Sequence, residues 1–159
     1  MMTYTTKCGV RMTLGPATAE DLMSANPISV NAADPIGEAT AMLTDRGFSA
    51  APVIDEAGRP LGVVSRADIL IHERERFHHL RPSTDVFGSL GFAVEEVDPT
   101  RVEDVMTPAV FTVALETPAA QVVRQMCDLH VHQLFVVDPT GSLIGVISAL
   151  DLVRHLHEE

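Results

Sequence analysis

The chain has 159 residues, of which 46% are hydrophobic, 21% are charged and 4% are aromatic. This composition is typical of a globular protein with an aliphatic core and excludes a disordered chain. The formal net charge of −11 argues against nucleic acid and anionic membranes as partners, because both are negatively charged. No apolar run has the length of a signal peptide or a membrane span. With only two cysteines, Cys8 and Cys127, these features predict a soluble cytoplasmic protein with free thiols.

An internal repeat is the strongest feature of the sequence. A displacement of 83 positions aligns residues 21–70 with residues 104–153 without a gap. Two related units of about fifty residues, joined by a dissimilar middle, are therefore expected to share one core. The predicted organisation is an N-terminal extension at residues 1–17, a first domain at 18–72, a connecting segment at 73–99 and a second domain at 100–159.

The pattern within each repeat predicts strand, helix, strand, strand and helix, preceded by a short leading helix. Proline is favoured at the first helical position, and apolar residues at helical spacing mark the buried face. An Asp followed three residues later by Gly marks a tight turn between two strands. In chain order, the first repeat is expected to contain a leading helix at the capping box Thr18–Asp21, an extended segment at residues 28–30, a helix from Pro35, strands at 51–54 and 61–64, and a helix over 66–79.

The second repeat carries the same signals in the same order. The segment before it, residues 81–99, is rich in Pro, Ser, Gly and Asp, which predicts a linker with one short helix. In chain order, the second repeat is expected to contain a leading helix at the capping box Thr100–Glu103, an extended segment at residues 111–113, a helix from Pro118, strands at 134–137 and 143–147, and a last helix that includes His155 and His157.

Three motifs occur in both repeats. They are Asp-x-Met-[Ser/Thr] from Asp21 and Asp104, a strand ending at Asp55 or Asp138, and Gly-Val-[Val/Ile]-Ser-x-x-Asp ending at Asp68 or Asp151. Over about 100 residues this tandem resembles a pair of CBS domains (cystathionine beta-synthase domains), also called a Bateman module. The resemblance implies an α/β fold of the α+β type, with two βαββα repeats packed as a pseudo-twofold pair. It also implies a homodimer, and clefts between the repeats that bind adenosine-containing ligands in many relatives.

The Ser-x-x-Asp motif stands where a strand gives way to a helix. Ser65 and Ser148 are expected at helix N-caps, where outward-facing backbone N–H groups favour an anion. Asp68 and Asp151 follow one turn later, and a carboxylate there can accept hydrogen bonds from the two hydroxyls of a ribose. The same Asp can instead serve only as a helix cap. The residues alone leave both interpretations open.

The resemblance implies that each cleft takes its walls from both repeats. Small residues at positions 49–51 make the Asp151 cleft more open, and we expect it to be the occupied one. Phe135 either stacks on a base or fills the Asp68 cleft. The walls expected for the Asp151 cleft are Met23, Ile28, Ser49, Ala50, Pro52, Val146 and Ser148, and those for the Asp68 cleft are Val63, Ser65, Met106, Phe111, His132, Gln133 and Phe135.

A nucleotide's phosphate needs a cation, and the acidic chain offers few candidates. Arg66 directly follows Ser65, and His132 holds a position where relatives place a histidine near phosphate. Either residue can also be an ordinary surface or strand residue. The shortage of cations favours a monophosphate over a triphosphate, so AMP is the regulatory ligand we expect, with no cofactor and no resident metal.

Three hypotheses about function follow. The first is a stand-alone regulatory module that binds AMP, ADP, ATP or S-adenosylmethionine and signals to an unidentified effector protein through dimer or partner geometry. The second is a structural dimerisation module without a ligand. The third is a metal or redox sensor using Cys127, His130 and His132, whose types and spacing suit a transition metal. No nucleophile and base are arranged for catalysis and no Gly-rich phosphate loop is present, so the sequence does not predict an enzyme.

Overall fold

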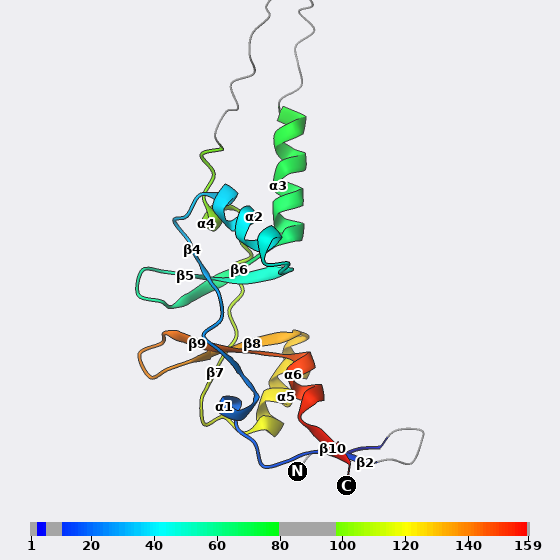
Figure 1. The fold of residues 1–159 in the computed structure, drawn as a ribbon. Coiled ribbons are helices and arrows are strands. Elements are labelled where there is room, and N and C mark those ends of the chain that lie inside the picture. Colours follow the sequence, from blue (N-terminus) through cyan, green and yellow to red (C-terminus); the bar gives the residue numbers. More distant parts are fainter. Residues whose placement is uncertain (1–2, 6–10, 80–97, 159) are drawn as a thin grey trace, which may run out of the picture.

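Two small β-sheets face each other at the centre of the molecule, and helices cover their outer faces (Figure 1). A computed structural model of the chain describes residues 3–5, 11–79 and 98–158. One half carries helices α2, α3 and α4, and the other carries α1, α5 and α6 (Figure 1). In the described residues, no helix combines the length and the hydropathy needed to cross a bilayer.

The strand, helix, strand, strand, helix order predicted for each repeat is confirmed. The first repeat contains β4 (Val30–Asn31), α2 (Ile36–Asp45), β5 (Ala50–Ile54), β6 (Pro60–Ser65) and α3 (Arg66–His79). The second repeat contains β7 (Thr112–Ala114), α5 (Ala119–Leu129), β8 (Gln133–Val137), β9 (Leu143–Ser148) and α6 (Ala149–Arg154). The leading helices α1 (Ala19–Leu22) and α4 (Val102–Val105) are also present. The mixed α and β fold with two related repeats is therefore the observed one.

The two central sheets repeat one topology. The first has the order β4-β5-β6, and the second has the order β7-β8-β9 with β3 (Ser24–Ala25) added beside β9. In each sheet the first pair of strands is parallel and the second pair is antiparallel. The antiparallel pairs join through the predicted tight turns, where the Asp55 and Asp138 carboxylates accept hydrogen bonds from turn N–H groups. Gly58 and Gly141 adopt φ values of 78° and 87°, which favour glycine.

The leading helices pack against the opposite repeat. Leu22 of α1 is 2% exposed and lies in a core with α5, β8 and β9, whereas Val102 of α4 is 0% exposed and lies in the core of the first half. Backbone hydrogen bonds hold them there, from Ala19 N to Thr117 O at 2.8 Å and from Val102 N to Asp34 O at 3.0 Å. The expectation of one shared core is wrong: the described residues form two cores, and each core contains a helix from the other repeat.

The chain crosses between the halves directly after each leading helix. Ser24 pairs with Val146 of β9, and Thr107 pairs with Val63 of β6. A Cβ atom added to Gly62 would lie 2.5 Å from the carbonyl oxygen of Thr107, and one added to Gly145 would collide with Met23. Glycine in the middle of each returning strand is therefore what allows the crossing segment to approach.

Several predicted boundaries are wrong by one or two residues. Pro35 and Pro118 precede their helices as extended N-cap residues, so α2 and α5 begin one position later than predicted. Only Val30 and residues 112–113 of the predicted extended segments belong to strands. The second capping box lies one residue later than predicted. Arg101, rather than Thr100, is the N-cap of α4, and the carboxylate of Asp104, rather than that of Glu103, accepts the Arg101 N–H at 3.0 Å.

The end of the chain departs furthest from the prediction. The last helix stops at Arg154, and His157 lies in β10 (Leu156–Glu158), not in a helix. Strand β2 (Arg11–Leu14) lies between β1 (Thr3–Thr5) and β10, both of which are antiparallel to it. Residues of β10 therefore form backbone hydrogen bonds with β2, which lies far away in the sequence, instead of continuing the hydrogen bonds of helix α6. Residues 80–97 of the predicted linker, with its short helix, lie outside the described residues.

Asp98 links α3 to the start of the second repeat. Its Oδ2 atom lies 2.9 Å from His72 Nε2 and forms a salt bridge with Arg76 Nη1 at 2.9 Å. Its Oδ1 atom accepts the Thr100 N–H at 3.0 Å. Partial burial acts to raise the pKa of Asp98, but the hydrogen bonds from Thr100 and His72 and the charge of Arg76 outweigh it and lower the pKa to about 2.

This cluster predicts an acid-sensitive contribution to stability. A carboxyl with a lowered pKa stabilises the folded state above its unfolded pKa, and this contribution is lost as the pH falls from about 4 toward 2. We therefore expect the melting temperature of the Asp98→Asn variant to fall less steeply over that range than that of the wild type. Circular dichroism melts at a series of pH values measure this. The exposed Asp45→Asn variant is the control, and equal slopes for wild type and Asp98→Asn would contradict the prediction.

Candidate ligand pocket between the two sheets

A pocket of about 210 Å³ lies where β5 of one sheet meets β8 and β9 of the other. Sequence reasoning assigned Ile28, Ala50, Pro52 and Val146 to one cleft and Gln133 and Phe135 to another, but the structure brings all six together. It also places Ala51 there, one of the small residues at positions 49–51 predicted to open the cleft, and it adds Pro27 and Phe48, which no signal in the sequence indicated.

Strand alternation explains why these side chains face the pocket. Successive residues of a strand point to opposite faces of its sheet. In β8, Leu134 and Val136 belong to the core of the second half, so Gln133 and Phe135 face the other sheet. Phe135 is only 3% exposed although it lies outside that core cluster. Contact between the two sheets is therefore what buries it.

The pocket is apolar with one exception. Among the described residues that line it, Gln133 is the one with a polar side chain. Phe135 is fully buried, whereas Phe48 and Ile28 are 38% and 40% exposed. An apolar slot with aromatic walls and a single amide suits a flat heteroaromatic ring better than a charged group.

Both Ser-x-x-Asp motifs border residues of the pocket. Ser65 pairs with Ala50 in the ladder between β5 and β6, and Ser148 pairs with Gln133 in the ladder between β8 and β9. In each motif the Asp carboxylate accepts the serine N–H at 2.8 Å and the serine hydroxyl at 2.6 Å. The capping role is thus present in both repeats. Neither Asp68 nor Asp151 lines the pocket, and binding of a ribose by either remains a prediction.

The two Asp residues differ in their surroundings. Asp151 is 9% exposed, and Arg154 Nη1 lies 3.5 Å from its Oδ1 atom. Asp68 faces a separate recess of about 160 Å³ between α3 and α4. Three carboxylates make that recess electronegative, which disfavours a phosphate there. Its lining residues are Asp68, Ile71, His72, Glu75, Asp104 and Val105.

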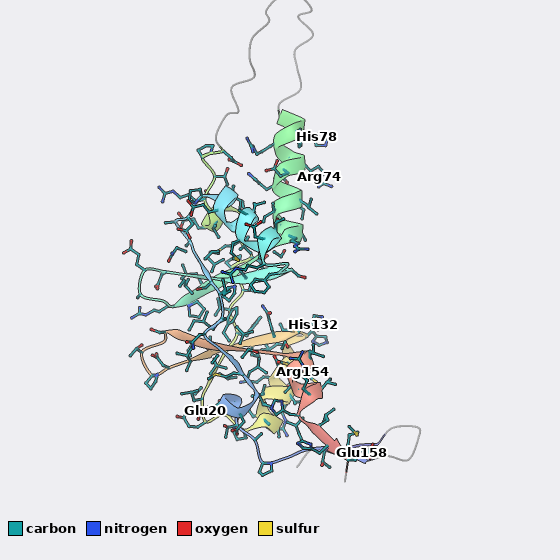
Figure 2. All side chains as sticks on the ribbon, in the orientation of Figure 1. Glu20, Arg74, His78, His132, Arg154 and Glu158 are labelled. Atoms are coloured by element: carbon teal, nitrogen blue, oxygen red, sulfur yellow. The ribbon has the colours of Figure 1, made fainter. Side chains whose placement is uncertain are left out.

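Ser49 and His132 lie beside the pocket, and the first residues of α3 and α6 form hydrogen bonds with their backbone carbonyls. The N–H of Arg66 donates to the Ser49 carbonyl at 3.0 Å, and the N–H of Ala149 donates to the His132 carbonyl at 2.9 Å. Figure 2 shows His132 at the start of β8, on the side where α6 begins. Both Arg66 and His132 have exposed side chains, although Arg66 Nη2 also donates to the Leu43 carbonyl at 3.1 Å. Both side chains therefore lie near the pocket without lining it.

Four other predicted wall residues do not line the pocket. Met23 and Met106 are partly buried against the two central glycines of the returning strands. Val63 pairs with Thr107. Phe111 is 37% exposed, and its carbonyl accepts the Phe135 N–H at 2.9 Å.

The three residues of the metal hypothesis do not form a donor set. Cys127, His130 and His132 are all exposed, and His130 ends α5 in a left-handed conformation with φ of 55°. Within residues 3–5, 11–79 and 98–158, no group of three or more His, Cys, Asp or Glu residues could hold a metal ion. The part of the chain that the structure describes therefore gives the metal form of the third hypothesis no site.

Comparison with known proteins identifies the repeats. The family model of the CBS domain matches residues 19–75 and again residues 102–158. The gamma-3 subunit of 5'-AMP-activated protein kinase from Bos taurus is 31% identical over 123 residues, which are 77% of this chain and 22% of that protein. The chloroplastic CBS domain-containing protein CBSX1 from Arabidopsis thaliana is 26% identical over 144 residues, which are 85% of this chain and 59% of that protein. The chain thus spans less than two thirds of these curated relatives.

Solved structures show the same fold. CBSX2 in complex with AMP is 26% identical and superimposes with a TM-score of 0.65. The alignment covers 87% of this chain and 94% of the CBSX2 chain. The CBS domain pair of protein MJ0100, solved with 5'-methylthioadenosine and S-adenosyl-L-methionine, is 21% identical and superimposes with a TM-score of 0.63. The alignment covers 87% of this chain and 98% of that chain.

Proposed function

The chain belongs to the CBS domain family, and from this premise we propose that it is a regulatory module, and not an enzyme, that binds an adenosine-containing ligand between its two sheets. AMP is the ligand we propose first, because the acidic chain offers few cations for more than one phosphate. The observation that carries the proposal is the apolar slot with aromatic walls, bordered by both Ser-x-x-Asp motifs.

The slot is large enough for only one part of an adenosine nucleotide. Pockets that enclose a whole drug-sized ligand have volumes of about 300–1,000 Å³, and this one has about 210 Å³. It therefore accommodates the purine ring and leaves the ribose and phosphate at the mouth. There, Ser148 lies opposite Gln133 in the ladder, and we propose the exposed side chains of Arg66 and His132 as the groups that contact the phosphate.

The relatives support the same class of ligand. CBSX2 was solved with AMP, and the gamma-3 subunit belongs to a kinase named for activation by 5'-AMP. Because that relative is one subunit of a larger enzyme, we also propose that this chain passes its signal to a partner protein, and that two copies associate.

A thermal shift titration tests the proposal. Ligand at 100 times its dissociation constant adds about 2.7 kcal/mol to the free energy of unfolding, so AMP is expected to raise the melting temperature. The Asp151→Ala variant should lose most of this shift, because the ribose would lose its acceptor. Asp68→Ala is the control, since each variant removes the carboxylate that accepts the serine N–H and hydroxyl in its capping box.

Two outcomes would count against the proposal. If AMP, ADP, ATP and S-adenosylmethionine at millimolar concentrations all leave the melting temperature unchanged, the dimerisation module without a ligand becomes the better account. If AMP stabilises the wild type and Asp151→Ala equally, the assignment of the ribose to Asp151 is wrong.

A further inference from the structure

We infer that Gln133 reads the edge of the bound base and makes the pocket select adenine over guanine. This inference rests on the proposed function and adds a specificity determinant to it. Gln133 is the first residue of β8 and half-buried, and it faces the opposite sheet together with Phe135.

The internal repeat singles out this residue. The position equivalent to Gln133 in the first repeat is Ala50, which lines the same pocket but has no hydrogen-bonding side chain. Every other lining side chain in the described part of the chain is also apolar. Within this slot, a base can therefore form side-chain hydrogen bonds only with the Gln133 amide.

The chemistry of one amide among apolar walls distinguishes the two purines. The amide oxygen can accept from the N6 amino group of adenine while the amide nitrogen donates to N1, which satisfies that edge of the ring. Guanine can also form two hydrogen bonds with the amide, through O6 and N1–H, but its 2-amino group then has no side-chain acceptor in the slot. An unpaired buried donor is costly, so we expect AMP to bind roughly ten-fold more tightly than GMP.

Isothermal titration calorimetry with AMP and GMP tests the inference on the full chain. The Gln133→Glu variant replaces the amide by a carboxylate, which accepts from both N1–H and the 2-amino group of guanine but repels N1 of adenine. Its preference should reverse toward GMP. The Gln133→Leu variant should lose most of the AMP preference. Gln121→Glu, an equal change of charge on the exposed surface of α5, should keep the wild-type ratio.

The ratio of the two dissociation constants is the quantity to compare, because added negative charge weakens both nucleotide monophosphates alike. If Gln133→Glu and Gln133→Leu keep the wild-type ratio, or if the wild type prefers GMP, the inference is overturned while nucleotide binding stands. If the wild type binds no adenosine compound, the proposed function and the inference both fail. Should the carboxylate variant not fold, as judged by circular dichroism, Gln133→Leu alone decides.

Discussion

Replacing Leu22 with alanine is expected to lower the free energy of unfolding by about 2–5 kcal/mol, the usual cost of removing a buried leucine side chain. The loss should appear in the second half of the molecule, although Leu22 belongs to the first repeat, because its side chain packs in the core of α5, β8 and β9. Denaturant unfolding measures the total loss. Native-state hydrogen exchange locates it, with faster exchange expected for β8 and β9 than for β5 and β6.

The second leading helix provides the reciprocal control. Val102 of α4 is completely buried in the core of the first half, so Val102→Ala should accelerate exchange in β5 and β6 instead. Its total effect should be smaller, because fewer buried carbon atoms are removed. Faster exchange in β5 and β6 upon Leu22→Ala would contradict the interlocked arrangement of the two halves.

Filling the slot is expected to abolish nucleotide binding without unfolding the protein. Ala50 lines the pocket, and the large side chain of Gln133 occupies the equivalent position of the second repeat, so the strand geometry tolerates a larger residue there. The phenyl ring of an Ala50→Phe variant would enter a volume of about 210 Å³ that the purine needs. Calorimetric titration with AMP should then give no measurable heat of binding at millimolar concentrations.

A matched variant separates this effect from a general change in the protein. Ala41 is an exposed residue of α2 and does not line the pocket, so Ala41→Phe should bind AMP as the wild type does. Circular dichroism should show the same folded content for both variants. Wild-type affinity in a folded Ala50→Phe variant would exclude this slot as the place where the base binds.

Local sequence signals predicted most of the fold. The repeat fixed the order of the elements in both halves, and each element carries its own signal, such as apolar spacing in α5 or the Asp and Gly of the tight turns. Boundaries were less accurate, since Pro35 and Pro118 can either begin a helix or precede it.

Features that depend on distant segments could not be predicted in the same way. Nothing in residues 155–158 signals pairing with β2, which lies about 140 residues earlier. Likewise, the pattern around Leu22 shows that one side of a short helix is apolar but not which core it enters. The candidate site was predicted only as a set of residues, because strand alternation shows which face Phe135 occupies but not what faces it across the gap between the sheets.

The most direct test of the central claim, that an adenosine nucleotide binds between the two sheets, is a crystal structure of the protein grown with AMP. We expect the adenine ring in the slot between Pro52 and Phe135, within reach of the Gln133 amide, and the ribose on the side where α6 begins. Nucleotide bound in the recess beside Asp68, or a slot that stays empty at saturating AMP, would contradict it.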